Sequence, residues 1–484
     1  MVTAIGVLGA SAASAVPAGS WDGYVTQQGT DLVTAFDTAT LETNGVGASI
    51  ALPPAQVPTF PAISPDGSKA YVPDSTAAGG VGVVDTATGT LVGTIAVGTP
   101  PNRYPYAVAF SPDGTRAYVS LFFTASVAVI DTASETQVGT ITVGDFPYDL
   151  VVSPDGGSLF VADNGSDAVS VVDLATGTVT ATIAVGASPL GLTQLPDGST
   201  LFVANADDDS VSVVDVATGT ETATIPVTGP EAVRAAPDGS VVLVTSSNGT
   251  VAFIDPATNS VEGSVTVGAQ PRWIAFTPDA ATAYVTAATA NIVTPVDVAT
   301  RTARTPVGGL SVPTGVAVSP DQAPTAVLAP PAPVTIGTLT TFDASGSTSP
   351  VGEVVSYAWD FGDGATLTTT GPTATHTYAT VGDHVVSLTV TDTAGTSTTV
   401  VLTGGTVSRN GGPTATTQVT ASVLAAAPTP APAPAPAPPT PAPSPGAILP
   451  VTGSGTAAGA ALAAALTMAG AAMTTIARRR RRVG

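Results

Sequence analysis

The sequence has no cysteine, one lysine and only two histidines among its 484 residues. Without cysteine, the chain has no disulfides, no thiolate metal ligands and no cysteine nucleophile. Both histidines, His376 and His384, follow residue 321, so the preceding part offers no imidazole as a general base or zinc ligand. Basic residues are also scarce: 13 Lys and Arg stand against 35 Asp and Glu, and the net charge is −22. Such an acidic chain is not expected to bind nucleic acid, because phosphates are bound by cationic surfaces.

The abundant residues are Val, Thr and Ala, together with 51 Gly and 43 Pro. β-Branched residues favour strands, while Gly and Pro favour the turns between them. The composition therefore predicts an all-β body, and the length gives room for two or three domains.

A repeat of about 42 residues covers residues 24–321. Each unit contains four short strand patterns separated by Gly, Asn or Asp turns, which is typical of one blade of a β-propeller. Two marks each recur seven times, so we predict seven blades. The first mark is Pro-Asp, at Pro65-Asp66, Pro112-Asp113, Pro154-Asp155, Pro196-Asp197, Pro237-Asp238, Pro278-Asp279 and Pro320-Asp321. The second is an apolar strand that ends in Asp37, Asp85, Asp131, Asp173, Asp215, Asp255 or Asp297.

The two ends of the repeat belong to the same blade. The chain enters at Tyr24-Val25 on the first strand type and leaves on the fourth type, at residues 315–320. We therefore expect the last strand to join the blade that begins at Tyr24, which closes the ring without a free edge. Over residues 21–322 these motifs resemble the YVTN-type seven-bladed propellers, which share their architecture with lactonase-like propellers and archaeal surface-layer proteins. The resemblance implies the fold but leaves the function open.

A second proline stands seven residues before each Pro-Asp proline, and the residues just after it differ between units. If the strand that follows is the innermost of its blade, as in this family, these side chains surround one mouth of the central channel. Aromatic and arginine side chains suit a glycan or protein ligand. The alternative is drift of the repeat without any ligand. The candidate ligand-binding residues, one of them from the enlarged unit at 99–104, are Arg103, Tyr106, Tyr148, Glu231, Arg272 and Trp273.

Residues 323–408 break the period and form a second domain. Tyr357-Ala358-Trp359-Asp360-Phe361-Gly362-Asp363-Gly364 and the alternating strand 387–391 resemble a PKD domain, which is an immunoglobulin-like β-sandwich. Trp359 is the expected core anchor. The histidines are expected to have a structural role within this sandwich.

Two acidic groups are weak candidates for a calcium site, because hard cations prefer carboxylate oxygens. One is Asp207-Asp208-Asp209, which falls in a loop between two strands, and the other is Asp360 with Asp363. The competing interpretation is a solvated hairpin turn for the first group and hydrogen bonds to backbone amides for the second. We expect no other cofactor.

The C-terminal part is predicted to leave the globular fold. Residues 409–448 are expected to be an Ala/Pro-rich linker, whose segment 425–445 extends for about 60 Å as polyproline II. Residues 456–476 contain no charge and are long enough to cross a bilayer as a helix. The five arginines at 478–482 are expected to hold the cytoplasmic side.

A short motif stands before the predicted helix, so that the C-terminus has three parts in order: a pentapeptide, an apolar segment and a basic tail. The pentapeptide is Leu449, Pro450, Val451, Thr452 and Gly453. The whole of 449–484 resembles the LPXTG cell-wall sorting signal. The resemblance implies that a sortase cysteine breaks the bond between Thr452 and Gly453, and that an amine of a peptidoglycan precursor resolves the acyl-enzyme. The helix would then lie in the membrane only before sorting. The alternative is a permanent transmembrane anchor.

The N-terminal segment is ambiguous. Residues 1–20 are apolar and contain Ala13-Ser14-Ala15, which suits a signal peptidase, but they lack a positive n-region. We interpret them as a truncated signal peptide; the alternative is a disordered or strand-forming end.

Together these features predict a secreted, peptidoglycan-anchored surface protein without enzymatic activity. Its propeller binds an extracellular glycan or protein, or serves a structural role as in surface layers. The alternative is an exported lactonase-like or other propeller hydrolase, which the absence of histidine disfavours.

Overall fold

The computed structural model describes residues 23–38, 47, 49–101, 103–349, 353–392, 401–403, 406–410 and 413–427. The predictions for the signal peptide at 1–20, the linker beyond 427, the pentapeptide 449–453 and the helix 456–476 with its arginine tail fall outside these residues. Within the described ranges, no helix is long and apolar enough to span a bilayer.

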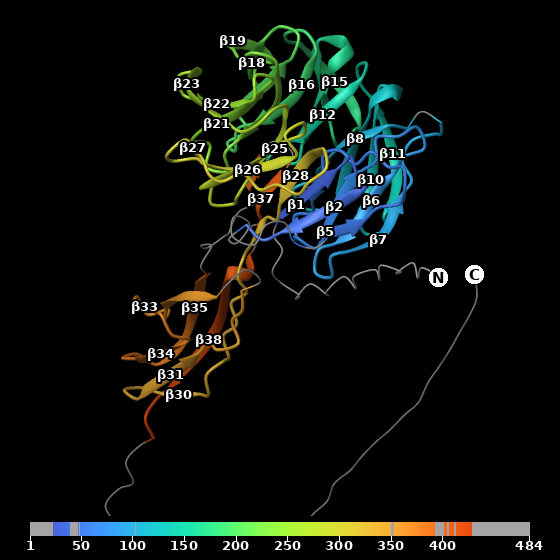
Figure 1. Cartoon of the computed structure of the whole chain (residues 1–484). Helices are drawn as coiled ribbons and strands as arrows, with labels where there is room; N and C mark the ends of the chain where they lie inside the picture. Colours follow the sequence, from blue (N-terminus) through green and yellow to red (C-terminus); the bar gives the residue numbers. More distant parts are fainter. Residues whose placement is uncertain are drawn as a thin grey trace, which may run out of the picture. The chain divides into compact units, whose positions relative to one another are not determined.

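Seven four-stranded antiparallel sheets are present among the described residues (Figure 1). We number them as blades 1 to 7 and give their strands from the innermost outward. Blade 1 consists of β28 (Pro313–Val318), β1 (Gly23–Gln27), β2 (Leu32–Phe36) and β3 (Ser49–Ala51). Blade 2 consists of β4 (Ala62–Ile63), β5 (Lys69–Pro73), β6 (Val81–Asp85) and β7 (Thr90–Ile95). Blade 3 consists of β8 (Pro105–Phe110), β9 (Arg116–Leu121), β10 (Ser126–Asp131) and β11 (Thr136–Thr142).

The next four blades follow the same plan. Blade 4 consists of β12 (Pro147–Val152), β13 (Ser158–Asp163), β14 (Ala168–Asp173) and β15 (Thr178–Ala184). Blade 5 consists of β16 (Pro189–Gln194), β17 (Thr200–Asn205), β18 (Ser210–Asp215) and β19 (Thr220–Pro226). Blade 6 consists of β20 (Pro230–Ala235), β21 (Val242–Ser246), β22 (Thr250–Asp255) and β23 (Ser260–Thr266). Blade 7 consists of β24 (Pro271–Phe276), β25 (Thr282–Ala287), β26 (Ile292–Asp297) and β27 (Thr302–Ala303).

The innermost strands form a closed ring, because β28, β4, β8, β12, β16, β20 and β24 each contact the next and β24 contacts β28. The ring is closed by the two ends of the repeat: β1 pairs antiparallel with β28, with Tyr24 opposite Ala317 and Val25 opposite Val316. The predicted closure of the propeller is therefore confirmed.

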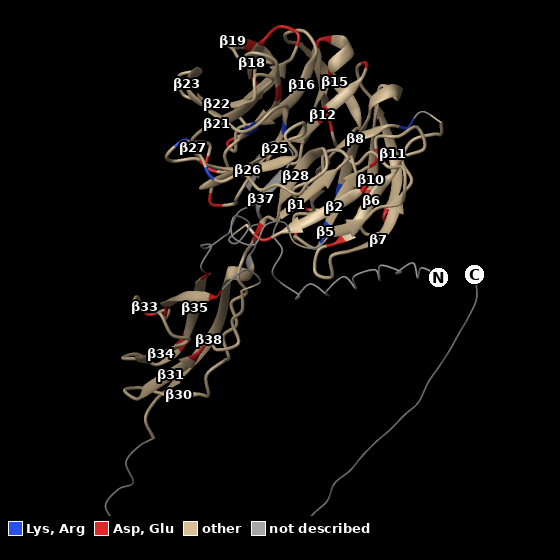
Figure 2. Cartoon of the chain, viewed as in Figure 1, with Lys and Arg blue, Asp and Glu red and all other residues tan. Residues whose placement is uncertain are grey.

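The repeated aspartates are turn residues. After β4, Asp66 Oδ1 accepts hydrogen bonds from Ser64 Oγ at 2.5 Å and from the Ser68 amide at 3.0 Å. At the other mark, Asp85 Oδ1 accepts the Thr88 amide at 2.8 Å. Each carboxylate satisfies a backbone amide that would otherwise lack a partner in a tight turn. The two periodic marks of the sequence are thus turns within a blade, one between its first and second strands and one between its third and fourth. Figure 2 marks the positions of Asp and Glu in red, and several of them fall in propeller loops.

Burial falls from the centre of a blade to its rim. Innermost strands such as β12 and β28 are buried at every position, whereas the outermost β15 is exposed at nearly every position. This gradient explains why the inner strands are continuous apolar runs and the outer ones are rich in threonine.

A β-sandwich follows the propeller in the chain. One sheet has the order β30 (Val334–Thr335), β38 (Thr416–Leu424), β35 (Gly382–Asp392), β32 (Val354–Asp360) and β33 (Thr366–Thr369). The other pairs β31 (Leu339–Asp343) with β34 (Thr373–Thr377). A further small sheet contains β29 (Asp321–Gln322), β37 (Thr406–Asn410) and β36 (Val401–Thr403). Trp359 is 2% exposed in the sandwich core, so it is the anchor expected from the sequence.

One segment differs from its predicted place. Residues 416–424 were expected in the Ala/Pro-rich linker but form β38, which pairs with β35 over Gly382–Thr389. Ala421 and Val423 of this strand are buried, while their neighbours Thr420 and Ser422 are exposed. This alternation is the signature of a half-buried strand and stands just before the proline-rich run.

Candidate functional site

The variable side chains at the start of the innermost strands lie together at one end of the channel. Trp273 of β24 stacks on Phe60, with ring centroids 3.7 Å apart and an interplanar angle of 7°. Tyr106 of β8 lies 5.4 Å from Phe60 and 4.3 Å from Tyr148 of β12. Phe60, Tyr148 and Trp273 are at most 6% exposed, so these rings pack on one another rather than lining an open cup. We call these four residues the aromatic plug.

An ion pair stands beside the plug. Arg272 Nη1 donates to Glu231 Oε1 at 2.7 Å, and the Tyr148 hydroxyl donates to the same oxygen at 3.5 Å. Burial raises the pKa of Glu231 even though the Arg272 charge acts in the opposite direction. The structure thus joins five of the six candidate residues, namely Tyr106, Tyr148, Glu231, Arg272 and Trp273, in one cluster.

The sixth candidate, Arg103, is held differently. Its Nη1 donates to the carbonyl oxygen of Ala78 at 3.4 Å, and its amide donates to the carbonyl oxygen of Ala77 at 3.2 Å. These bonds fasten the enlarged loop of 99–104 to blade 2 instead of directing the guanidinium into the plug.

A buried ion pair that the sequence analysis missed lies under the plug. Arg234 Nη1 donates to Asp149 Oδ2 at 2.9 Å, and both side chains are at most 4% exposed. The guanidinium carbon of Arg234 lies 4.0 Å from the centroid of the Trp273 ring, within the range of a cation–π interaction. Burial raises the pKa of Asp149, opposed by the Arg234 charge. The available sequence signal was an arginine inside the apolar strand Val233-Arg234-Ala235.

The plug continues outward as an exposed aromatic surface, which the sequence analysis also missed. Phe122 lies 5.7 Å from Tyr106 and stacks on Phe146 at 5.2 Å. Phe123 contacts Phe146 at 6.0 Å and Tyr104 at 4.6 Å, measured between ring centroids. Phe123 is 53% exposed and Phe146 is 41% exposed. We call Tyr104, Phe122, Phe123 and Phe146 the aromatic face. Aromatic residues are only 5% of the chain, so their concentration at one site is a local feature.

The acidic candidates for calcium are engaged with the protein itself. Asp208 Oδ2 accepts the Ala187 amide at 2.6 Å, and Asp209 Oδ1 accepts the Gly229 amide at 2.6 Å. Asp207 Oδ2 accepts the Ser188 hydroxyl at 2.6 Å. The three residues lie in an exposed turn between β17 and β18, as the competing interpretation expected, and their carboxylates bind neighbouring loops.

In the sandwich, Asp360 Oδ1 accepts the Gly362 amide at 2.9 Å, and Asp363 Oδ2 lies 2.8 Å from His376 Nε2. Among the described residues, no group of three or more His, Cys, Asp or Glu side chains is placed to hold a metal ion.

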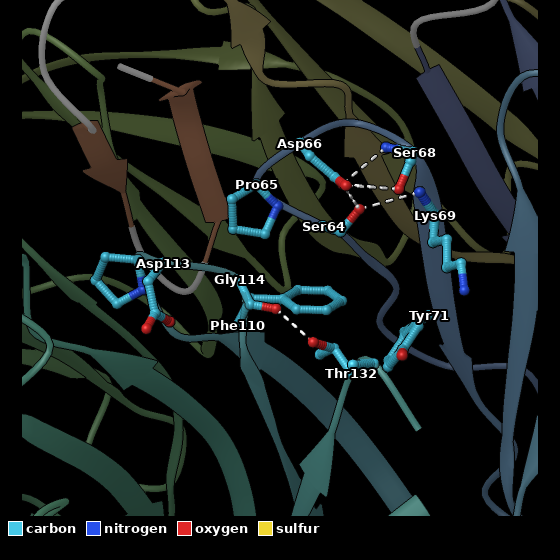
Figure 3. Close-up of a pocket in the computed structure, with 12 residues that line it drawn as sticks. Ser64, Pro65, Asp66, Ser68, Lys69, Tyr71, Phe110, Asp113, Gly114 and Thr132 are labelled. Carbon is cyan, nitrogen blue, oxygen red and sulfur yellow. Dashed lines mark hydrogen bonds between the residues drawn. The ribbon is translucent and has the colours of Figure 1, made fainter. Parts of the chain in front are cut away.

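A cavity of about 510 Å³ lies between blades 2 and 3, at the opposite ends of the innermost strands from the plug (Figure 3). Its lining includes Lys69 and Tyr71 of β5, the turn that contains Asp66, and the turn that contains Asp113. The buried hydroxyl of Tyr71 has no hydrogen-bond partner among the described residues.

The chain combines a β-propeller with a PKD domain, and family models match both parts. A seven-bladed lactonase β-propeller model matches residues 62–235, and a YNCE-like β-propeller model matches residues 186–320. A PKD domain model matches residues 321–405. The predicted all-β fold, a propeller followed by a PKD sandwich, is thus confirmed.

Among curated proteins, a microbial collagenase of Vibrio alginolyticus is 46% identical over 77 residues, which are 16% of this chain and 9% of the collagenase. Collagenase ColA of Bacillus cereus is 46% identical over 54 residues, which are 11% of this chain and 5% of that protein. The chain thus spans less than a tenth of the length of either collagenase.

Solved structures share the propeller fold at low sequence identity. A protein of unknown function from Desulfotomaculum acetoxidans is 18% identical with a TM-score of 0.53, covering 62% of this chain and 99% of its own. A protein from Lactobacillus plantarum is 19% identical with a TM-score of 0.52, covering 61% and 98%. A putative 6-phosphogluconolactonase from Bacteroides fragilis is 16% identical with a TM-score of 0.52, covering 64% and 99%. These similarities establish the fold alone.

Proposed function

We propose that this chain is a surface-displayed binding protein without enzymatic activity, whose propeller docks an extracellular glycan or protein through the aromatic face. The observation that supports it best is the exposure of Phe123 and Phe146, which are 53% and 41% exposed and continue outward from the plug, whose Tyr148 bonds to Glu231 of the ion pair with Arg272. Aromatic rings next to an arginine are the side chains that contribute most at binding interfaces. The plug behind them fixes the position of these rings.

Display at the cell wall is the second part of the proposal. It is supported by the order of the C-terminal sequence, in which Leu449–Gly453 precede an uncharged segment and five arginines. In this proposal a sortase joins Thr452 to a peptidoglycan precursor, and the proline-rich segment carries the propeller and the PKD domain outward.

A hydrolase is the competing function, because the lactonase propeller model matches residues 62–235. The buried pair of Asp149 and Arg234 is the natural place to look for chemistry in the channel. Both side chains are at most 4% exposed, and Trp273 stacks on Arg234, so a substrate at this mouth would first have to displace the plug. Turnover of a panel of lactones by the purified protein would favour the hydrolase.

The binding proposal is tested with the double variant Phe123→Ala/Phe146→Ala, which removes exposed rings and leaves the buried plug intact. On an array of glycans and proteins, the variant should bind each ligand of the native chain with an affinity lower by a factor of about ten or more, as expected when interface anchors are removed. The matched control is Val92→Ala/Val138→Ala, which shortens two side chains on the outermost strands β7 and β11, each 55% exposed. Equal binding by native and double-variant chains would contradict the proposal.

The anchoring proposal is tested with Thr452→Ala. The variant should move from the cell-wall fraction to the membrane fraction or the medium. The sortase would no longer find the threonine side chain beside the bond that it cleaves, so the acyl-enzyme would not form. Val451→Ala is the control, since the corresponding position of the motif is variable. Unchanged wall retention of Thr452→Ala would exclude sorting.

A further inference from the structure

In blades 1 and 7, the tyrosine of the repeated Tyr-Val strand bonds to the neighbouring blade. The hydroxyl of Tyr284 in blade 7 donates to the carbonyl oxygen of Thr38 in blade 1 at 2.9 Å. The hydroxyl of Tyr24 in blade 1 donates to the carbonyl oxygen of Thr86 in blade 2 at 3.3 Å. Both acceptors directly follow a repeated aspartate, Asp37 or Asp85.

Tyr71 of blade 2 makes no such bond. The repeat places Thr132, which follows Asp131, as its counterpart in blade 3. The Tyr71 hydroxyl nevertheless has no partner among the described residues, although the side chain is only 1% exposed. A buried hydroxyl without a partner destabilises the folded protein, because it has lost its hydrogen bonds to water. Two of its counterparts, Tyr24 and Tyr284, are satisfied by the next blade, so the buried Tyr71 hydroxyl is available to bond to a ligand instead.

The exception coincides with the cavity of about 510 Å³ between blades 2 and 3. Tyr71 and Phe110 form one wall, with ring centroids 4.8 Å apart. The turns that carry Asp66 and Asp113 also line the cavity, together with Thr132, whose hydroxyl donates to the carbonyl oxygen of Gly114 at 2.6 Å (Figure 3). The volume is within the range of small-molecule sites in proteins.

An ion pair spans the two blades beside the cavity. Lys69 of β5 bonds through Nζ to Glu135 Oε1, which lies just before β11 in blade 3. The side chains are 34% and 29% exposed, so this pair is a weak surface bridge. Lys69 lines the cavity and is the single lysine of the chain. Its ammonium has three donors, of which this bond uses one.

The lining groups define the chemistry of a ligand. Unused donors come from Tyr71 and Lys69, and the Oδ2 atoms of Asp66 and Asp113 each accept one hydroxyl and retain further acceptor capacity. Burial and the nearby charges of Glu135, Asp131 and Asp66 raise the pKa of Tyr71, so its phenol stays neutral at physiological pH. Two carboxylates against one ammonium on the lining disfavour an anion.

We propose that this cavity binds a neutral polyhydroxylated molecule of monosaccharide size, whose apolar face lies against Tyr71 and Phe110 and one of whose hydroxyls bonds to the Tyr71 hydroxyl. Alternating donors and acceptors beside an aromatic wall suit a ligand with hydroxyls on its rim and C–H groups on its face. The site is independent of the aromatic face and lies at the other end of the innermost strands.

The test is a titration of the full chain with neutral monosaccharides and inositol, followed by ligand-observed NMR and thermal unfolding. At least one probe should bind and raise the unfolding temperature, as any ligand of the native state does. Tyr71→Phe should weaken that binding roughly tenfold, the effect of losing one hydrogen bond. It should not lower the unfolding temperature of the free protein, because the deleted hydroxyl has no partner there.

Tyr284→Phe is the matched control, because its hydroxyl bonds to Thr38 instead of facing a cavity. It should lower the unfolding temperature and leave probe binding unchanged. Because Lys69 is the single lysine, amine labelling at this residue is a second readout, which a bound probe should slow. Absence of binding by every probe at millimolar concentration, or equal binding by Tyr71→Phe, would overturn the proposal. Tighter binding of glucuronate than of glucose would also contradict it.

Discussion

Two equivalent buried residues of neighbouring blades, one a carboxylate and the other an amide, show how a single side-chain atom changes the stability of this fold. Asp163 ends β13 and Asn205 ends β17, and both side chains are fully buried. Asn205 Nδ2 donates to Ser212 Oγ at 2.8 Å. Asp163 Oδ2 accepts a hydrogen bond from Ser170 Oγ, the residue equivalent to Ser212, and Oδ1 of both Asp163 and Asn205 has no partner among the described residues, so the two sites differ in the charge of the buried group.

Burial raises the pKa of Asp163 from 3.8 to about 6, against the hydrogen bond from Ser170. The folded protein therefore holds this proton more tightly than the unfolded chain, so Asp163 lowers stability as the pH rises from about 4 to about 6. We predict that Asp163→Asn raises the free energy of unfolding at pH 7 by about 1–3 kcal/mol. The gain should vanish near pH 4. Urea titrations at both pH values measure it, and a gain equal at both would contradict the assigned charge.

Residue-level prediction from the sequence succeeded where the repeat itself identified the position. The proline before each innermost strand located Tyr106, Tyr148, Glu231, Arg272 and Trp273, which meet in space. Phe123 and Phe146 were not predicted because they lie in loops, outside the positions that directly follow the repeated proline. Phe122–Thr124 forms a short 3₁₀ turn, and Phe146 has a φ of 53°. Arg234 escaped because a single charge in an apolar strand does not name its partner.

At the scale of the element, the junction of β1 with β28 depends on a few buried hydroxyls. Thr26 Oγ1 donates to the carbonyl oxygen of Thr59 at 2.7 Å and accepts the Gly315 amide at 2.8 Å. Thr314 Oγ1 donates to the carbonyl oxygen of Pro58 at 2.9 Å. These bonds connect blades 1 and 2 as well as the two ends of the repeat.

We predict that Thr26→Val lowers the free energy of unfolding by about 1–3 kcal/mol, because it leaves the buried Gly315 amide without its acceptor. Hydrogen exchange should quicken first in β1 and β28. Thr180→Val is the control, since the Thr180 hydroxyl is exposed and bonds to Val171 at 3.2 Å. Faster exchange spread evenly over all blades would contradict a local weakening of the closure.

Strands were predictable from the sequence because the pattern is repeated seven times, so irregular units such as the longer one at 99–104 do not obscure the period. The sandwich strand β38 was not predictable in the same way. It lies beyond the residues that resemble a PKD domain and just before the proline-rich run. Its partner β35 is separated from it by more than 20 residues. A single strand of nine residues carries too little signal to outweigh its surroundings.

At the scale of the molecule, the buried cores are separate. One cluster contains residues between Ala326 and Val423, and the others contain residues between Tyr24 and Val318. Trp359 belongs to the first and Trp273 to one of the others. Because no described core cluster includes residues of both parts, each can unfold without emptying the core of the other.

We predict two transitions in the calorimetric unfolding of the full chain. Asp163→Asn should move only one of them, since Asp163 lies in blade 4. Replacement of Trp359 by Phe should remove the fluorescence change of the other. A single transition that moves as a whole in the Asp163→Asn variant would contradict independent unfolding.

The pairing of β1 with β28 also imposes an order on biosynthesis. Among the propeller strands, the ribosome releases β1 first and β28 only after the other six blades have been made. At about 5–20 residues per second this interval is roughly 15–60 s. During that time the inner edge of β1 has no native partner, and nascent or prematurely terminated chains present an unpaired strand that can join a neighbouring molecule. Only chains translated past Val318 can complete the ring, so the last strand acts as a check that the whole propeller has been made.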